Sequence, residues 1–327
     1  MFLGTYHSKL YGKSEYDTIA VEDTYNLLKS NKTIDLCGHL PIERENLIQI
    51  CDLAKKCLLE DKTLLRIKPR VRIIGDLRGN YNHIWDMICG NEPTDQFLFL
   101  GDYVNNGKNS IEVITLVLCM KLIAPNQVFL LRGRQETPNM TDNCGFKEEC
   151  LSCFDKEIYD KFLEVFECLP LAAIITDIDK TKSILCMNGG LSPNLTNVDQ
   201  IDQIERPIKN VEKGLPYEIL FSDPSAEITK FTPNKSVKGA YLYGKTAAHT
   251  FLKNNELDHI VTSHQFSKNG YSYPFNEDHS VFSIFSTPDY NDGNGKFNTN
   301  AGVNLYLRES MLYTISRVND SKNNDTA

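Results

Sequence analysis

The feature of this sequence that most constrains its fold is a series of short apolar runs, rich in β-branched and aromatic residues. Each run ends at Gly, Asp, Asn, His or Pro, which is typical of buried strands that end in loops. They occupy residues 71–80, 96–107, 127–136, 183–193, 259–265 and 280–290. Helical patterns lie between the early runs, at residues 81–90, 109–123 and 145–167. This alternation of strand and helix predicts an α/β fold.

Two other segments carry clear patterns. In residues 41–67 apolar side chains recur at helical spacing, and Pro41 suits the first position of a helix. This segment is therefore predicted to be helical, and residues 20–30 are predicted to form a short amphipathic helix. Near the other end of the sequence, strand patterns predict an antiparallel meander at residues 240–244, 271–275, 304–309 and 311–318.

These patterns predict one domain of two sheets flanked by helices. No internal repeat divides the chain, so we expect one domain and not two independent ones. Residues 1–34 are predicted to be an N-terminal extension. The last residues, 319–327, are polar and are predicted to be a disordered tail.

Composition excludes two classes of partner. The 327 residues carry a net charge of −8, from 35 Lys and Arg against 43 Asp and Glu, and no block of five basic residues occurs. A nucleic acid or an anionic membrane would need such a basic surface, so we expect neither as a partner. The sequence has no secretion-signal pattern and no apolar stretch long enough to span a bilayer, so we expect a cytoplasmic or nuclear location, or both.

Polar side chains follow several of the predicted strands. Asp76, Asp102, Arg134, Asn188 and His264 each stand at or near the end of an apolar run. In α/β sheets the carboxyl ends of strands are where loops can aim polar groups at a common point. We therefore expect these five residues, which are distant in sequence, to converge.

The motifs around these residues resemble the phosphoprotein phosphatase family of metallophosphatases, and most closely the type-1 protein Ser/Thr phosphatase. In order, the motifs are GDLRGN, GDYVNNGKNSIE, LLRGRQE, NGGLSP, SHQ and STPDY, within residues 35–318. The family pattern is GDIHG, GDYVDRG, RGNHE, HGG and a His before Gln. The resemblance implies a calcineurin-like metallophosphatase fold, with a central two-sheet β-sandwich flanked by helices, so that residues 35–318 would form a Ser/Thr phosphatase-like domain.

The family's chemistry explains the residue types in its motifs. Two divalent metals hold the phosphoryl group and lower the pKa of a bridging water, which becomes the attacking hydroxide. Carboxylates and imidazoles hold the metals, and a protonated His neutralises the leaving alkoxide, an effect of about 10²–10⁴-fold in rate. If this chain is active, the resemblance implies two divalent metals of the Mn, Fe or Zn type.

Of the six positions that hold metal ligands in the family, three carry a different residue in this sequence. Asp76, Asp102 and His264 match ligands of the family. The other ligand positions hold residues that differ from the family pattern: Arg78 in place of a His, Arg134 in place of an Asn, and Asn188 in place of a His. An arginine has no lone pair to offer a metal and stays charged, so these changes argue against a metal centre, and no cofactor is expected.

The catalytic positions have changed as well. Gln135 stands at the position of the catalytic His, Asn105 replaces the Asp that orients that His, and Asn106 replaces a phosphate-binding Arg, while Tyr290 matches a family tyrosine near the active site. Glutamine has no titratable proton, so it cannot act as a general acid. Gln135 and Asn105 could keep the hydrogen bond of the original pair without its charge.

The two new arginines suggest how the centre is held without metals. We expect Arg78 and Arg134 to pair with Asp76 and Asp102, because unpaired carboxylates in a partly desolvated pocket are costly. The structural interpretation of Asp76, Asp102 and His264 is therefore favoured over residual metal binding. Whether the arginines bind phosphate or only pair with the aspartates stays open at this point.

A second surface of the fold is implied by the resemblance. Type-1 phosphatases hold a short extended motif of regulatory subunits in an apolar groove away from the active site. The corresponding positions are Ile184, His259, Tyr273, Met311, Tyr313 and Ile315, of which His259 is a departure. Strand addition with side-chain pockets would bind such a motif, although the same residues could equally be core.

The sequence thus leads to three hypotheses of function. The preferred one is a pseudophosphatase, a catalytically inactive type-1-like protein that acts by protein binding as a scaffold, decoy or regulator. The second is an active or weakly active metal-dependent Ser/Thr phosphatase. The third is a reader that binds phosphate or phosphopeptides through Arg78, Arg132 and Arg134 without hydrolysis.

Overall fold

The computed structural model describes residues 15–35, 38–89, 96–290 and 299–318. Its α-helices are α1 (Glu15–Ser30), α2 (Arg44–Glu60), α3 (Tyr81–Cys89), α4 (Ser110–Ile123), α5 (Pro138–Asn143), α6 (Phe146–Cys153), α7 (Lys156–Glu167), α8 (Leu215–Phe221) and α9 (Lys245–Asn254). Short 3₁₀ turns occur at Arg134–Glu136 and Val198–Gln200.

The strands of the described residues form three sheets. The six-stranded sheet has the order β1 (Leu64–Ile67), β5 (Ala172–Thr176), β6 (Ser183–Met187), β10 (His259–Thr262), β12 (Val281–Ile284) and β11 (Tyr271–Ser272). The five-stranded sheet has the order β14 (Tyr313–Arg317), β13 (Val303–Leu307), β2 (Val71–Ile74), β3 (Gln96–Phe99) and β4 (Val128–Leu130). A small third sheet has the order β7 (Asp223–Pro224), β9 (Tyr241–Tyr243) and β8 (Phe231–Pro233).

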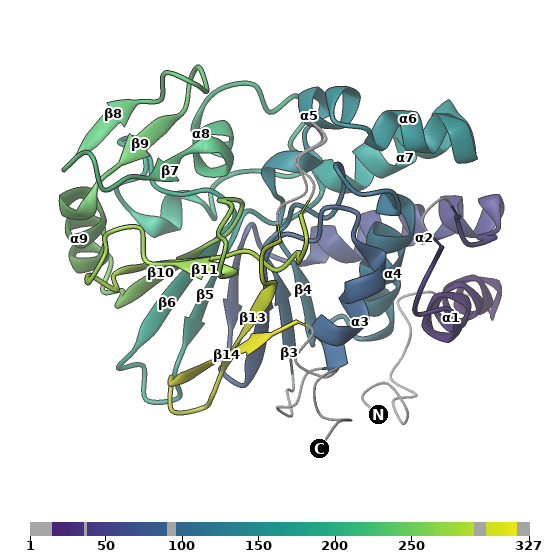
Figure 1. Cartoon of the computed structure of the whole chain (residues 1–327), viewed down its shortest axis with the longest axis horizontal. Helices are drawn as coiled ribbons and strands as arrows, with labels where there is room; N and C mark the ends of the chain where they lie inside the picture. The colour runs from purple at the N-terminus through teal and green to yellow at the C-terminus, as the bar shows by residue number, and fades with distance from the viewer. Residues whose placement is uncertain (1–14, 36–37, 90–95, 291–298, 319–327) are drawn as a thin grey trace.

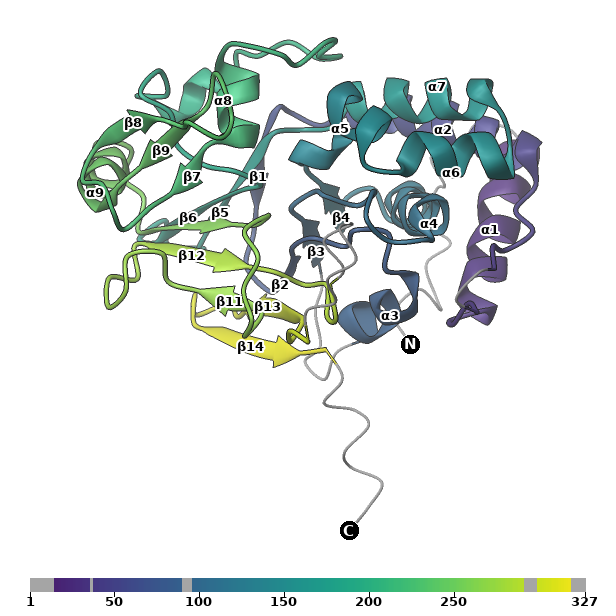
Figure 2. The ribbon, with the colours of Figure 1, turned by 45° about the horizontal axis from the view of Figure 1, so that its top comes forward.

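The elements are arranged in layers around the two larger sheets (Figure 1). Between these sheets lies one apolar core, to which the five-stranded sheet contributes Ile73 and Leu98 and the six-stranded sheet Ala173, Val261 and Phe282. A second core joins the outer face of the five-stranded sheet to the helices α1–α4, α6 and α7 (Figure 2). On the other side, α8, α9 and the small sheet cover the six-stranded sheet. The predicted α/β fold with two sheets flanked by helices is confirmed.

One predicted helix is shorter than the sequence pattern suggested. Within residues 41–67, α2 covers Arg44–Glu60 only, so Pro41 precedes the helix, and the apolar end of the segment is strand β1. This strand pairs in parallel with β5, in the register Leu64 to Ala172. A short apolar run satisfies both helical and strand periodicity, and here the sheet partner decides between them.

The predicted helix at residues 145–167 is divided into α6 and α7. The division lies at Phe154 and Asp155, and the Asp155 side chain caps α7 by accepting a hydrogen bond from the Ile158 amide at 3.1 Å. An aspartate directly before an apolar repeat is a helix-capping pattern, and this one marks the start of α7 in the sequence.

The predicted antiparallel meander near the end of the sequence is wrong. Of the four strands predicted for the meander, only β13 and β14 pair with each other, while β9 belongs to the small sheet and β11 pairs with β12 of the six-stranded sheet. Strand β13 also pairs with β2, so its second edge is taken by a strand from the first half of the chain. Local strand patterns carry no information on which distant edge a strand joins.

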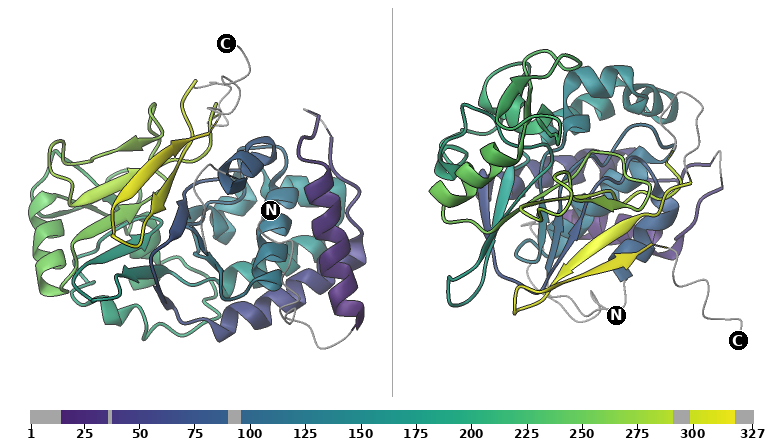
Figure 3. Two further views of the ribbon diagram at one scale, coloured as in Figure 1. Left: turned by 90° about the horizontal axis from the view of Figure 1, so that it is seen from below. Right: turned by 60° about the vertical axis from the view of Figure 1, so that its left-hand side comes forward.

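The first described helix packs on the rest of the molecule. In α1, which begins at Glu15 and so is longer than predicted, Val21 and Leu28 are buried in the core shared with α2 and α4. The Tyr81 hydroxyl donates a hydrogen bond to the Leu28 carbonyl at 2.6 Å. The left view of Figure 3 shows α1 beside the other helices of this layer. The tail predicted at residues 319–327 lies outside the described residues.

Within the described residues, no helix combines the length and the apolar character that crossing a membrane requires.

Candidate functional site

The carboxyl ends of strands from both large sheets meet at one place. Asp76 follows β2 and Asp102 follows β3, which are neighbouring parallel strands, and Arg134 follows β4. From the other sheet, Asn188 follows β6 and His264 follows β10, which are also parallel neighbours. Hydrogen bonds among these segments, described below, show that the predicted convergence occurs.

The backbone of this site is held in an uncommon conformation. Arg78, Asp102, Asn105, Asn106 and His264 all have positive φ, between 47° and 72°. Non-glycine residues adopt this left-handed region rarely, and each such residue costs of order 1–3 kcal/mol, which the contacts around it must offset. Strain of this kind is concentrated where loops leave the strand ends, as is typical of functional sites.

A buried glutamate fixes the loops after β3 and β4. One carboxylate oxygen of Glu136 accepts hydrogen bonds from the Asp102 and Gly133 amides at 2.8 and 2.9 Å, and the other accepts from the Tyr103 amide at 2.8 Å. The two loops approach so closely that a Cβ added to Gly101 would lie 2.3 Å from the Gly133 nitrogen. Sequence reasoning assigned Glu136 no role, although it ends the motif LLRGRQE.

Arg78 forms the centre of the site. Its Nη2 lies 2.8 Å from Asp76 Oδ2 and 2.7 Å from Asp102 Oδ2, and its Nε donates to Asp76 Oδ2 at 2.8 Å. Its Nη1 donates to Asn106 Oδ1 at 3.1 Å. Arg78 is 4% exposed and both aspartates are fully buried, so the predicted pairing of Arg78 with the two carboxylates is confirmed.

The remaining carboxylate oxygens are also occupied. Asp76 Oδ1 accepts hydrogen bonds from the Ser263 hydroxyl and from the His264 amide, the latter at 2.8 Å. Asp102 Oδ1 accepts a hydrogen bond from the Gln135 amide at 2.9 Å. All four oxygens of the two aspartates therefore have partners within the protein. Ser263 was not identified from the sequence, although it stands directly before the SHQ motif's histidine.

The two aspartates differ electrostatically. Burial raises the pKa of Asp102, but the Arg78 guanidinium, the charges of Arg134 and His264 and the Gln135 amide outweigh burial and hold its pKa below the usual range. For Asp76, burial dominates and raises the pKa, and Arg78 opposes this effect only in part. The arginine thus keeps at least Asp102 ionised at neutral pH.

The predicted pairing of Arg134 is wrong for the described residues. The Arg134 backbone amide donates to Asn188 Oδ1 at 3.0 Å, but its guanidinium forms no ion pair with Asp76 or Asp102, and its Nε is buried without a hydrogen bond. The guanidinium carbon lies 6.0 Å from the centre of the Phe221 ring in α8. Because Arg134 opens a 3₁₀ turn, its side chain leaves the strand end in a direction that strand spacing could not predict.

Gln135 and Asn105 keep the hydrogen bond expected of them. Asn105 Nδ2 donates to Gln135 Oε1 at 2.8 Å, and Asn105 Oδ1 accepts from the Phe146 amide at 3.0 Å. Both side chains are buried. The pair is therefore a neutral, structurally satisfied contact with no titratable proton.

His264 and Asn188 complete the site from the six-stranded sheet. His264 Nε2 lies 2.8 Å from Asp223 Oδ1, and its Nδ1 is buried without a hydrogen bond among the described residues. In the neutral ring with its proton on Nε2, donated to Asp223, Nδ1 carries a lone pair. Both polar atoms of the Asn188 side chain have a partner, because its Oδ1 accepts from the Arg134 amide and its Nδ2 donates to the Leu100 carbonyl at 3.1 Å. Asp223 was not assigned a role, though it lies in the segment FSDP.

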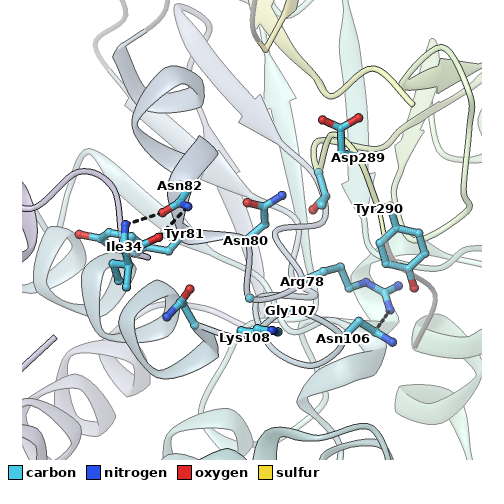
Figure 4. A pocket seen from close by; sticks show the side chains of 13 residues that line it. Ile34, Arg78, Asn80, Tyr81, Asn82, Asn106, Gly107, Lys108, Asp289 and Tyr290 are labelled. Atoms are coloured by element: carbon cyan, nitrogen blue, oxygen red, sulfur yellow. Dashed lines mark hydrogen bonds between the residues drawn. The ribbon is translucent and has the colours of Figure 1, made fainter. Parts of the chain in front are cut away.

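A pocket of about 330 Å³ opens beside Arg78. Tyr290 and Asn106 line it next to Arg78, and Asn80, Lys108 and Asp289 lie farther along it (Figure 4). The Arg78 guanidinium carbon lies 5.8 Å from the centre of the Tyr290 ring. The site is therefore accessible from one side, but the side of Arg78 that faces Asp76 and Asp102 is buried.

The residues of the expected docking groove also come together. In the structure they are Ile184 in β6, His259 in β10, Tyr273 after β11, Met311 before β14, and Tyr313 and Ile315 in β14. We call these six residues the edge surface, because β14 is the outermost strand of its sheet.

The edge surface combines buried and exposed residues. Ile184 and Met311 are buried in the core between the sheets, and Tyr273 and Ile315 pack against that core. The hydroxyls of Tyr273 and Tyr313 are 2.8 Å apart, and Tyr313 is 44% exposed. The surface is thus partly core and partly open.

Comparisons with known proteins agree with this architecture. A family model described as calcineurin-like phosphoesterase matches residues 69–268, which is more than half of the chain. A solved protein serine/threonine phosphatase from Saccharomyces cerevisiae, with similarity to human phosphatase PP5, is 24% identical, with a TM-score of 0.76 over 93% of this chain and 95% of that chain. A cold-active protein-tyrosine phosphatase of a psychrophile, Shewanella sp., is 13% identical, with a TM-score of 0.52 over 80% and 84% of the two chains. At these identities the two solved structures show a shared fold.

Proposed function

The chain belongs to the calcineurin-like phosphoesterase family, and from this premise we propose that it is a catalytically inactive, type-1-like Ser/Thr phosphatase that acts by binding proteins. The calcineurin-like fold predicted from the motifs is confirmed by the family match. The proposal concerns the finer step, the loss of catalysis and its replacement by a role as scaffold, decoy or regulator.

The observation that carries the proposal is the position of the Arg78 guanidinium. It lies between Asp76 and Asp102, the two carboxylates that would share metals in the family pattern, and bonds to both. A divalent cation there would have to displace a buried arginine and approach carboxylates whose four oxygens are all engaged. The described residues therefore do not fit a two-metal centre. Among the three surviving ligand positions, His264 Nδ1 is the one metal-binding atom without a hydrogen bond in the described part of the chain.

The second support is the chemistry of the general-acid position. Gln135 is buried and bonded to Asn105, so it offers no proton to a leaving alkoxide. Loss of such an acid alone lowers the rate by about 10²–10⁴-fold. Together with the metal positions, this favours loss of turnover over a weakened enzyme.

We expect no turnover of phosphoserine peptides by the full chain in Mn²⁺ or Zn²⁺. The measurement is phosphate release over hours at high protein concentration, with an Asp102→Asn variant prepared in parallel as the background. Turnover in the wild type that disappears in Asp102→Asn would contradict the proposal and support the active phosphatase.

One observation favours a phosphate reader as a second candidate. Arg134 has no ion pair with the two aspartates and is only partly buried, so its guanidinium remains available for a phosphate beside Phe221 and Tyr217. Arg132 does not contribute, because it donates to the backbone carbonyls of Glu136 and Ile208. Phosphorylated peptides that bind at least about tenfold tighter than their unphosphorylated forms, with the difference lost in Arg134→Met, would support the reader over the scaffold.

We propose the edge surface as the place where a protein partner binds. The partner would be a short extended segment that adds to the outer edge of β14, the outermost strand of its sheet among the described residues, with apolar or aromatic residues at alternate positions, because side chains on one face of a strand alternate. Such a segment matches a regulatory subunit with a short docking motif. Tyr313 is the exposed aromatic residue of this surface.

We expect Tyr313→Ala to weaken binding of such a peptide by about tenfold or more, while the stability changes by less than about 1 kcal/mol, because exposed aromatic anchors contribute to binding and little to folding. Fluorescence anisotropy measures the affinity for a panel of peptides that carry apolar or aromatic residues at alternate positions. Hydrogen exchange of residues 313–317 locates the binding site. Ile178→Ala, which removes a 68% exposed apolar side chain elsewhere, is the matched control. Equal effects of the two variants would exclude the edge surface.

A further inference from the structure

Three potential metal ligands meet on the helical side of the molecule. They are His39, in the segment between α1 and α2, Glu112 in the first turn of α4, and Glu149 in the first turn of α6. One ligand atom from each lies within 4.8 Å of the others. His39 Nδ1 is 3.1 Å from Glu112 Oε1 and 3.4 Å from Glu112 Oε2.

Each carboxylate is fixed by a backbone donor. Glu112 Oε1 accepts a hydrogen bond from the Leu40 amide at 2.9 Å, and Glu149 Oε1 accepts one from the Ile111 amide at 2.8 Å. Both bonds use one oxygen of each carboxylate and hold it in place. Of the second oxygens, Glu112 Oε2 lies 3.4 Å from His39 Nδ1.

Glu112 is 1% exposed, and Glu149 is partly buried. The basic side chain of the cluster is His39, which lies within 4.8 Å of both carboxylates. A divalent cation would bring two positive charges to the two carboxylates.

A buried hydroxyl points to the same place. Ser110 is fully buried and lies close enough to Glu149 to lower the pKa of that carboxyl, yet its Oγ makes no hydrogen bond of ordinary geometry. A buried polar atom left without a full partner is uncommon in a folded protein. A water bound to a cation could supply the missing donor.

We propose that His39, Glu112 and Glu149 bind one divalent transition-metal cation, with Zn²⁺ as the best match to one imidazole and two carboxylates. The ligand atoms lie within 4.8 Å of one another, and a small rotation of one side chain would bring them to bonds of about 2.0–2.2 Å to one cation. His39 can make this movement, because its side chain is 35% exposed. The cation would join the segment before α2 to the first turns of α4 and α6, which makes its role structural.

This site is independent of the proposed function, since none of its ligands belongs to the site around Arg78. The test uses the full chain, stripped of metal by chelator and then titrated with Zn²⁺ by calorimetry. Co²⁺ serves as a spectroscopic probe, because its visible bands report the ligand set. The variants are His39→Ala and Glu149→Gln, and His249→Ala is the matched control, since His249 is a half-exposed histidine 2.7 Å from a carboxylate oxygen of Asp278.

We expect one Zn²⁺ per chain in the wild type and in His249→Ala, and a loss of at least about tenfold in affinity in His39→Ala and Glu149→Gln. Zn²⁺ should raise the melting temperature of the wild type and leave that of His39→Ala unchanged. Three results would overturn the site: no saturable binding to the wild type, equal binding by His39→Ala, or a strong thiolate band with Co²⁺, which would place the metal on cysteine.

Discussion

Arg78→Met is expected to lower the free energy of unfolding by about 3–5 kcal/mol at neutral pH, because it leaves two fully buried carboxylates without their common cation. Methionine keeps much of the volume of the arginine stem. The decrease in the free energy of unfolding therefore reflects the lost charge more than lost packing. The measurement is urea denaturation in the presence of chelator, with the free energy extrapolated to zero denaturant.

Arg134→Met is the matched control for this prediction. It removes the same group two strands away, after β4 of the same sheet, but Arg134 has no ion pair with the aspartates, so we expect a loss below about 1 kcal/mol. Equal losses in the two variants would show that the positive charge of the site as a whole stabilises it, and not the Arg78 bonds.

The effect of Arg78→Met should depend on pH in a defined direction. In the wild type the pKa of Asp102 is lowered, so its contribution to stability is present above its unfolded pKa and is lost as the pH falls through its folded pKa. In the variant, burial without Arg78 raises the pKa of both aspartates, and the variant loses stability as the pH rises. The difference between the two proteins should therefore be largest near neutral pH and shrink toward pH 4. A difference that is constant between these values would mean that the carboxylates are not its source.

The sequence predicted the centre of the site better than its surroundings. The positions of Asp76, Asp102 and Arg78 follow from motifs at strand ends. A buried arginine beside two buried carboxylates has few other partners, so its pairing with both could be predicted. The same holds for Gln135 and Asn105, whose amides replace a charged pair of the same shape. These contacts are determined by residue type and by strand register, which motifs preserve.

The contacts that sequence reasoning missed depend on long-range placement. Arg134 was expected to pair with the aspartates, but the 3₁₀ turn that it opens directs its side chain toward Phe221 of α8. His264 finds its partner in Asp223, which belongs to a different sheet. Nothing in the spacing of residues along the chain places α8 or the small sheet over this site. The same reason accounts for β1, whose apolar run fits a helix until β5 pairs with it.

Restoring the family residues at four positions is expected to create a metal-dependent phosphatase. The variant combines Arg78→His, Arg134→Asn, Gln135→His and Asn188→His. The three changed metal-ligand positions would then join Asp76, Asp102 and His264, and position 135 would regain its general acid. Histidine tolerates the left-handed backbone of position 78 better than most residues, which makes this exchange feasible. We expect binding of Mn²⁺ and turnover of phosphoserine peptides, whereas each single substitution should give neither, because a two-metal site acts as a unit.

The triple variant that keeps Gln135 separates metal binding from proton transfer. It should bind Mn²⁺ as the quadruple variant does, since Gln135 is not a ligand position, but its turnover should be lower by about 10²–10⁴-fold for want of the general acid. Metal content by mass spectrometry and phosphate release give the two readouts independently. If the quadruple variant folds and binds no metal, something other than the four substituted side chains prevents metal binding. The hydrogen bonds of Ser263 and Glu136 would then be the next contacts to change. If a single substitution restores turnover, the wild-type centre is closer to an enzyme than the position of Arg78 implies, and the proposal of an inactive protein would have to be given up.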